Sequence, residues 1–192
     1  MPRIVGGSAK GRRIKSPSKR VRPATARARK ALFDYLSDFI PGSTILDLFC
    51  GSGGLGLEAL SRGGKSACFV DSAAKSINTA KQNAVLLGLR DQSTFICKDV
   101  FRFLRNYNDI VGHKFDLICA APPYRIAQPQ RILDTIAEAE VIDISGVVCL
   151  EYDRHTPMPK SNHFKLDRRK VYGETVVEVW DYEPCIKEDT NS

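Results

Sequence analysis

The regular alternation of short apolar runs with segments of helical spacing is the feature that most limits how this 192-residue chain can fold. Five apolar runs, at residues 45–49, 67–70, 94–97, 115–119 and 147–151, are separated by helical patterns at 55–60, 73–87, 100–107 and 130–139. A strand, a helix and a second strand in this order form a unit whose two strands are parallel. Two later runs, 164–171 and 175–182, flank a turn at Gly173 and predict an antiparallel pair. We therefore predict an α/β fold with a doubly wound, mostly parallel sheet and an antiparallel C-terminal edge.

The positive charge of the chain is concentrated at its N-terminus. Residues 1–30 contain eleven of the 29 lysines and arginines and none of the 22 acidic residues, so the rest of the chain is mildly acidic. This asymmetry indicates a segment that contacts nucleic-acid phosphates, although a solvated tail or a transit peptide has a similar composition. Pro17 and Pro23 disfavour the transit peptide, because they interrupt the amphipathic helix that it would need.

The same N-terminal segment predicts a small basic hairpin, since Arg3–Gly6 and Arg12–Lys15 flank a glycine-containing turn. We divide the chain into a basic N-terminal hairpin and arm at residues 1–24, one α/β domain at 25–186 and a polar tail at 187–192.

The cysteines and the first residues indicate the compartment. The six cysteines form no C-x-x-C pair and only three histidines accompany them, which disfavours a zinc site. The N-terminus lacks the apolar core of a secretory signal, and no apolar run approaches the ~18 residues of a membrane helix. We expect a cytoplasmic monomer without disulfides, bound metal or membrane contact.

A glycine-rich loop follows the first apolar run. Gly51-x-Gly53-x-x-Gly56 precedes a helical pattern, and Asp71 lies twenty residues after Gly51, which is the spacing of a dinucleotide-binding fingerprint. Asp47 argues against a dinucleotide, because a carboxylate at the end of the strand repels a pyrophosphate. It attracts a sulfonium and an α-amino group, so the loop favours S-adenosylmethionine over NAD.

Two further acids follow the next two strands of the predicted sheet. Asp71 is placed to accept hydrogen bonds from both ribose hydroxyls, and Asp99 to accept one from the adenine amino group. With Asp47, Gly51 and Gly53 they form the predicted cofactor site. The alternative interpretation is that the glycines form only a tight turn and that Asp71 and Asp99 cap helices.

A proline loop ends the fourth apolar run and predicts the chemistry. Ala121-Pro122-Pro123-Tyr124 combines two fixed φ angles, free backbone carbonyls and an aromatic face on which a base can stack. Exocyclic-amine methyltransferases have Asp/Asn-Pro-Pro-Tyr/Phe at this point. Along its whole length the chain resembles the bacterial small-subunit (16S) ribosomal RNA guanine-N2 methyltransferase family. The matching stretches are Arg3-Ile4-Val5-Gly6-Gly7, Gly11-Arg12-Arg13, Arg22-Pro23-x-Thr25, Arg29-Lys30-Ala31-Leu32-Phe33, Asp47-Leu48-Phe49-Cys50-Gly51-Ser52-Gly53, Leu57-Glu58-Ala59-Leu60-Ser61-Arg62-Gly63, Pro122-Pro123-Tyr124 and Tyr172-Gly173-Glu174-Thr175.

This resemblance implies a Rossmann-like class I methyltransferase that transfers a methyl group from S-adenosylmethionine to the N2 amine of a guanine in 16S rRNA, naked or in an assembling small ribosomal subunit. It implies that the side chain at position 121 and the carbonyl of Pro122 hold the two N–H groups of the amine. Pro123 stiffens the loop, and Tyr124 stacks on a base swung out of its helix.

The chain departs from the family pattern at Ala121, which has no side-chain acceptor. An engineered inactive variant, a natural lineage that orients the amine differently and a protein that binds without turnover all remain open. We expect Ala121→Asp to raise the methylation rate substantially and to leave cofactor affinity nearly unchanged. A second departure is Ala26, where the family usually has an acid.

For RNA binding we select the arginines of the basic segment, Arg12, Arg13, Arg22 and Arg29, because guanidinium groups bind phosphates. Glu58 and Glu151 are assigned no role in catalysis. The competing functions are an NAD-dependent oxidoreductase, a non-enzymatic RNA-binding or assembly protein on the same scaffold, and a DNA adenine methyltransferase, for which the chain has no separate target-recognition region.

Overall fold

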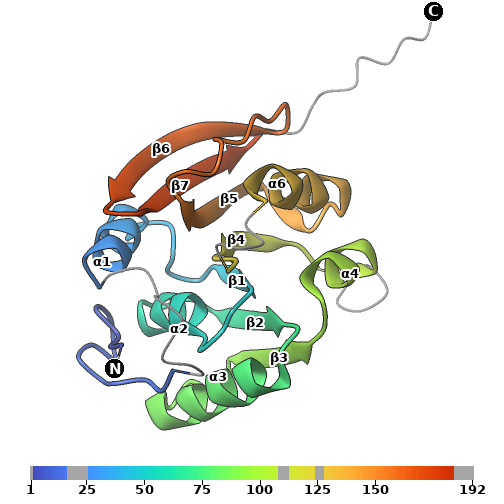
Figure 1. Ribbon diagram of the computed structural model, residues 1–192. Coiled ribbons are helices and arrows are strands. Elements are labelled where there is room, and N and C mark those ends of the chain that lie inside the picture. The colour runs from blue at the N-terminus through green and yellow to red at the C-terminus, as the bar shows by residue number, and fades with distance from the viewer. Residues whose placement is uncertain (1, 17–25, 108–112, 124–127, 184–192) are drawn as a thin grey trace, which may run out of the picture.

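A computed structural model gives the fold and describes residues 2–16, 26–107, 113–123 and 128–183. Its strands form one seven-stranded sheet in the order β3-β2-β1-β4-β5-β7-β6 (Figure 1). The first five strands are parallel, whereas β7 is antiparallel to both β5 and β6. The strands are β1 (Thr44–Leu48), β2 (Ser66–Asp71), β3 (Ser93–Cys97), β4 (Phe115–Ala120), β5 (Ile142–Asp153), β6 (Phe164–Tyr172) and β7 (Thr175–Tyr182). The predicted mostly parallel sheet with an antiparallel C-terminal edge is confirmed.

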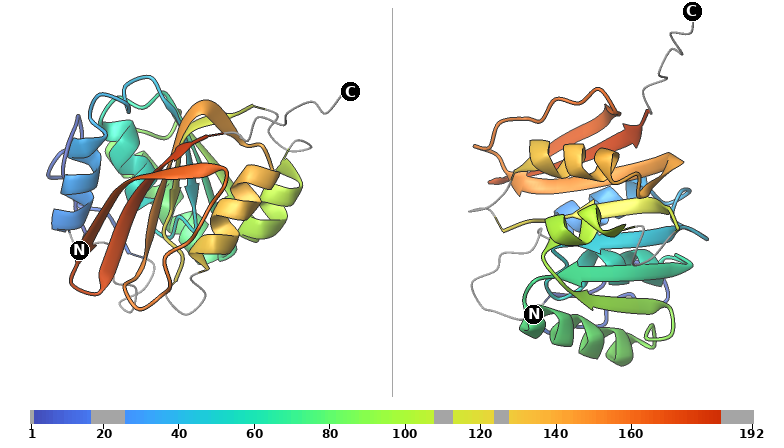
Figure 2. Two further views of the ribbon diagram at one scale, coloured as in Figure 1. Left: turned by 90° about the horizontal axis from the view of Figure 1, so that it is seen from above. Right: turned by 90° about the vertical axis from the view of Figure 1, so that its right-hand side faces the viewer.

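Helices cover both faces of this sheet, as the view from above in Figure 2 shows. One face carries α1 (Ala26–Tyr35), α2 (Gly54–Ser61) and α3 (Ala74–Leu87), and the other carries α4 (Val100–Arg105) and α6 (Pro129–Glu138). Two of these helices begin or end at a glycine or proline that favours a helix terminus. Gly88 ends α3 with a φ of 75°, a left-handed conformation that favours glycine, and Pro129 opens α6, where its missing N–H is harmless.

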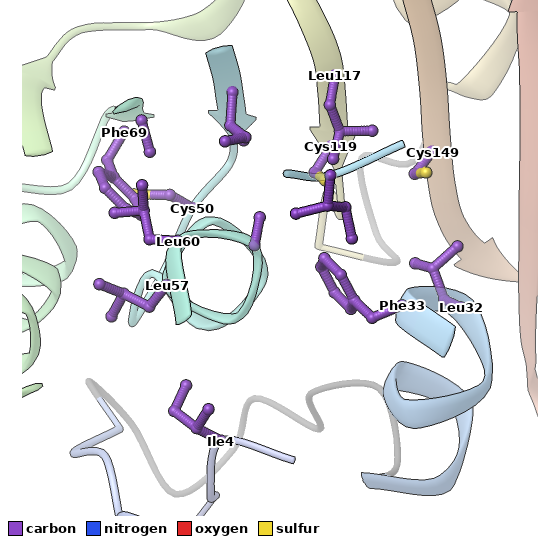
Figure 3. Close-up of a cluster of buried hydrophobic side chains, with 14 of the residues drawn as sticks. Ile4, Leu32, Phe33, Cys50, Leu57, Leu60, Phe69, Leu117, Cys119 and Cys149 are labelled. Atoms are coloured by element: carbon purple, nitrogen blue, oxygen red, sulfur yellow. The ribbon is translucent and has the colours of Figure 1, made fainter. Parts of the chain in front are cut away.

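Alternating residues of each strand enter two separate cores. In β1, Ile45 packs under α1 to α3, whereas Leu46 packs under α4 and α6. Figure 3 shows the first core, where Phe33 of α1 lies between the helix and the strands that carry Cys119 and Cys149. A sheet buried on both faces needs nearly continuous apolar strands, which explains why the apolar runs dominate the sequence pattern.

The fifth strand differs most from its sequence-based bounds. The fifth strand begins at Ile142 and not at 147, since Ile142 pairs with Phe115 across a register shift. The sequence hid this start because polar Asp143 and Ser145 interrupt the apolar pattern. The first helix ends at Tyr35, and the chain to Ile40 continues as hydrogen-bonded turns.

The N-terminal hairpin is part of the folded body. The Ile4 N–H donates to Arg12 O at 3.0 Å and the Gly11 N–H to Ile4 O at 2.8 Å, which closes the hairpin. The apolar side chains of Ile4, Ala9 and Ile14 are buried in the core beneath α1 to α3. A hairpin with this much buried surface is anchored to the protein, although its outer side chains are exposed.

Within the described ranges no helix has both the length and the hydropathy required to cross a membrane. The five cysteines in these ranges are free thiols.

Candidate functional site

The glycine loop and the proline loop leave the sheet next to each other. Strands β1 and β4 are paired in parallel, with Leu48 opposite Ala120. The residues that follow both strands therefore begin at the same edge, where the carboxyl ends of parallel strands form the usual ligand crevice of such sheets. The structure thus brings Gly51 and Ala121, which are 70 positions apart in sequence, to neighbouring loops.

The three glycines of the first loop serve different purposes. Gly51 has a φ of 54°, and a Cβ built there would approach only Phe49 O, at 4.0 Å, so this part of the loop is open to a ligand. At Gly53 a Cβ would lie 3.2 Å from atoms of Ala80, Leu57 and Phe69. At Gly56 it would lie 2.5 Å from the Phe69 ring. Gly51 fits the predicted cofactor contact, whereas the packing of the loop requires Gly53 and Gly56.

Asp47 holds the far end of the glycine loop. Its side chain is 1% exposed, and its Oδ2 accepts a hydrogen bond from the Gly56 N–H at 2.9 Å. Burial raises the pKa of Asp47 to about 8. The hydrogen bond from Gly56 opposes this rise, and the charge of Asp71 adds to it. We expected a carboxylate facing the ligand, but the structure shows one enclosed behind the loop.

Asp71, by contrast, lies at the crevice. It is half-buried at the end of β2, and its two oxygens accept from the Gly51 N–H at 2.9 Å and the Ala73 N–H at 2.8 Å. Each carboxylate oxygen has a second lone pair, so both remain able to accept from ribose hydroxyls. The bond to Gly51 also fixes the open part of the glycine loop.

Asp99 lies close to Asp71, because the Lys98 N–H donates to the Asp71 backbone carbonyl at 3.1 Å. Its Oδ1 accepts from the Arg102 N–H at 2.9 Å and caps α4. Asp99 therefore caps a helix, as the alternative interpretation of the sequence expected. The exposed side chain still stands beside the crevice, where an adenine contact stays a prediction.

The proline loop is described only in its first part. Ala121 is half-buried, Pro122 is buried and Pro123 is exposed. Tyr124, which was expected to stack on the base, lies outside the described residues. The methyl group of Ala121 offers no hydrogen-bond acceptor, so the side-chain half of the expected clamp is missing here.

The four arginines selected for RNA binding are placed differently from one another. Arg13 is exposed. Arg12 donates to the carbonyls of Leu86 and Leu87, with 3.2 Å between its Nη1 and Leu87 O, and thereby satisfies the end of α3. Arg22 lies outside the described residues.

Arg29 differs from the expectation of a phosphate-binding residue. It is 3% exposed, donates from Nη2 to Arg3 O at 2.7 Å, and its Nη1 lies 3.1 Å from the position of a Cβ built at Gly54. Its Nε has no hydrogen-bond partner among the described atoms. Burial lowers the pKa of Arg29, while the charges of Glu58 and Glu151 oppose that change.

Sequence reasoning missed one acid of this region. Glu151 is 8% exposed in β5, directly after Leu150, which pairs with Ala120. The rule that selected Asp47, Asp71 and Asp99, an acid at the carboxyl end of a parallel strand, also applies to Glu151. The sequence alone assigns Glu151 no role in catalysis, although the predicted fifth strand ends at this residue; the pairing of Ala120 with Leu150 is what places it beside the proline loop.

The chain matches a known family over nearly its full length. The family described as "Conserved hypothetical protein 95" matches residues 2–181. The chain is 32% identical over 184 residues to the Bacillus subtilis (strain 168) protein named "Putative rRNA methyltransferase YlbH", with 93% of this chain and 97% of that protein covered. It is 28% identical over 184 residues to "Ribosomal RNA small subunit methyltransferase D" of Escherichia coli (strain K12), with 94% and 90% covered.

A solved structure has the same fold. The Escherichia coli protein named "Putative methyltransferase yhhF" superposes with a TM-score of 0.81 at 26% sequence identity, over 95% of this chain and 98% of that one.

Proposed function

This chain belongs to the family described as "Conserved hypothetical protein 95", a family of methyltransferases, and from that premise we propose that it transfers a methyl group from S-adenosylmethionine to the N2 amine of a guanine in 16S rRNA. The observation that carries this proposal is the adjacency of the glycine loop and the Ala121-Pro122-Pro123 segment, which follows from the pairing of Leu48 with Ala120. A cofactor methyl group and a target amine can therefore be held side by side.

The cofactor half of the site fits S-adenosylmethionine. The open side of Gly51 lets the ligand approach the backbone, and Asp71 offers oxygens to the ribose. Gly53 shapes the loop through its packing, and Asp99 is proposed to accept a hydrogen bond from the adenine amino group. The cofactor supplies an electrophilic methyl group on sulfur. Asp47, behind the loop, supplies negative charge near that sulfonium when it is ionised.

The base half of the site rests on the proline loop. The carbonyl of Pro122 accepts one N–H of the guanine amine, and Pro123 limits the freedom of the loop. Tyr124 is proposed to stack on the extruded base, as an aromatic residue at this position can. Holding the nitrogen in line with the methyl group lowers the barrier mainly through orientation, which contributes up to several kcal/mol.

The basic segment is proposed to bind the RNA backbone. Arg13, which is exposed, and Arg22 in the arm are better candidates for phosphate contact than Arg12 and Arg29. Arg12 and Arg29 are used in internal hydrogen bonds and are proposed to support the hairpin. The expected partner is 16S rRNA, naked or in an assembling small subunit in the cytoplasm, and the expected state is a monomer.

The test is methyl transfer from labelled S-adenosylmethionine to 16S rRNA, supplied both naked and in partly assembled particles, with cofactor binding measured by calorimetry. The expected result is cofactor binding together with label at guanine N2. Label on another base or atom would contradict the proposed target. Absence of cofactor binding would contradict the whole assignment.

One alternative from the sequence stays relevant. Cofactor and RNA binding without any transfer would identify a binding or assembly protein on a methyltransferase scaffold, which the missing acceptor at Ala121 favours. The oxidoreductase alternative is removed, because the family to which the chain belongs is one of methyltransferases.

A further inference from the structure

A carboxylate lies directly beside the position where the family acceptor is missing. Strands β4 and β5 run parallel and in register, with Cys119 opposite Cys149 and Ala120 opposite Leu150. The next residue is Ala121 after β4 and Glu151 in β5. Neighbouring strands are about 4.8 Å apart, so these two positions are adjacent at the carboxyl edge.

The side chain of Glu151 lies on the face of the sheet that α1 to α3 cover. Cys119 and Cys149 both point into the core beneath α1 to α3, and a strand returns to the same face every second residue. Asp47 of β1 pairs with Cys119 and therefore lies in the same row. Glu151 is two residues after Cys149 in β5, so it lies nearer to the carboxyl edge of the sheet. The glycine and proline loops begin at this edge.

Glu151 is only 8% exposed, and it has a cation nearby. Arg29 lies close enough for the negative charge of Glu151 to act on its guanidinium. A buried carboxylate is tolerated when a cation of this kind is near, whereas removal of one partner leaves an uncompensated charge. A glutamate also has one methylene more than an aspartate. Its side chain starts one strand spacing, about 4.8 Å, from Ala121, beside the space that an aspartate at position 121 would fill.

On the basis of the function proposed above, we propose that Glu151 supplies the side-chain acceptor that Ala121 lacks. Its carboxylate accepts one N–H of the guanine N2 amine, and the carbonyl of Pro122 accepts the other. During transfer the bond from N2 to the methyl carbon forms, the bond from that carbon to sulfur breaks, and S-adenosylhomocysteine leaves. The methylated amine then loses one proton to water, so Glu151 acts only as a hydrogen-bond acceptor.

The decisive measurement is the single-turnover rate of methyl transfer for a set of matched variants. Glu151→Met keeps the approximate shape but has no acceptor, and we expect its rate to fall about 30-fold, as loss of a hydrogen bond to a charged group predicts. Glu151→Gln keeps an acceptor oxygen and should stay within about fivefold of the unmodified protein. Cofactor affinity, measured by calorimetry, should change little in either variant.

Ala121→Asp provides the second arm, and its effect in the unmodified background does not depend on the folding of the Glu151 variants. With Glu151 in place the added acceptor is largely redundant, so the expected gain is less than about fivefold, in place of the substantial gain expected from the sequence alone. In the Glu151→Met background the same substitution should restore most of the lost rate, about 30-fold. A gain that is equal in the two backgrounds would show that the two positions act independently and would overturn the proposal.

The remaining outcomes separate this inference from the proposed function. An unmodified protein that binds cofactor and RNA but transfers nothing, while Ala121→Asp transfers, rejects the role of Glu151 and retains the methyltransferase site. Equal rates for Glu151→Met and the unmodified protein also reject it. If neither the unmodified protein nor Ala121→Asp binds S-adenosylmethionine, the proposed function itself fails.

Discussion

At the scale of single residues, Asp47 shows how burial changes what a carboxylate can do. The sequence places it where a cationic ligand is expected, but the structure encloses it behind Gly56 and raises its pKa from an ordinary value of 3.8 to about 8. At neutral pH the ligand-free protein therefore holds this group mainly protonated. A cation that binds nearby favours the ionised form, so cofactor binding and proton release are coupled at this residue.

The raised pKa of Asp47 predicts a pH-dependent stability. Above about pH 4 the unfolded chain releases the Asp47 proton, whereas the folded protein keeps it until about pH 8. Binding of this proton therefore stabilises the folded state fully below the unfolded pKa, and the stabilisation is lost as the pH rises toward 8. Asp47→Asn stays neutral throughout. Its stability relative to the unmodified protein should rise between pH 5 and 8 by on the order of 1 kcal/mol per pH unit, measured by urea unfolding. A difference that stays constant with pH would show that Asp47 is ionised in the folded protein.

At the scale of elements, the predictable parts are those that depend on local pattern. The five parallel strands, the glycine turn at Gly88 and the loops at Gly51 and Pro122 are all marked by neighbouring residues in the sequence. Register between strands is not marked in this way, because it depends on packing between segments that are distant in sequence. The adjacency of Ala121 and Glu151 therefore emerged only from the structure.

The N-terminal hairpin was predicted as an element, but its attachment was not. Its basic composition indicated an exposed arm, whereas Arg29 is buried beneath it and the backbone of the hairpin is held by side chains of α2 and α3. Those anchors, Ser61 and Asn83, are small polar residues whose partners cannot be identified without the tertiary fold.

Ser61→Ala tests this attachment. The Ser61 hydroxyl donates to Gly6 O at 2.7 Å and accepts from the buried Ala9 N–H at 2.9 Å, so its loss leaves two backbone groups unsatisfied. We expect a loss of about 1–3 kcal/mol in the free energy of unfolding and faster amide hydrogen exchange at residues 4–13. The control is Thr79→Ala in α3, whose exposed hydroxyl bonds only within its own helix and whose loss should cost less than about 0.5 kcal/mol. Equal effects of the two substitutions would mean that the hairpin does not depend on Ser61.

At the scale of the whole molecule, the uneven distribution of charge predicts how RNA binding responds to salt. The double variant Lys10→Gln/Arg13→Gln removes two exposed charges of the hairpin. If both contact phosphates of single-stranded RNA, the slope of log K against log salt should become shallower by about 1.4, or about 0.7 for each contact. The matched control Lys114→Gln/Lys165→Gln removes two exposed charges elsewhere. The same reduction in slope for both variants, measured by titration at several salt concentrations, would contradict a specific role for the hairpin.

The attachment of the hairpin also has a consequence for the order in which the chain is made. Its partners follow it by 53 to 75 positions: Val5 donates to Glu58, Lys15 to Asn83 and Arg12 to Leu87. At about 5–20 residues per second, the first segment to be translated waits several seconds before the last of these partners is synthesised. During that interval the most positively charged part of the chain has no folded body to pack against. The hairpin is thus fixed in place only after α2 and α3 have been made.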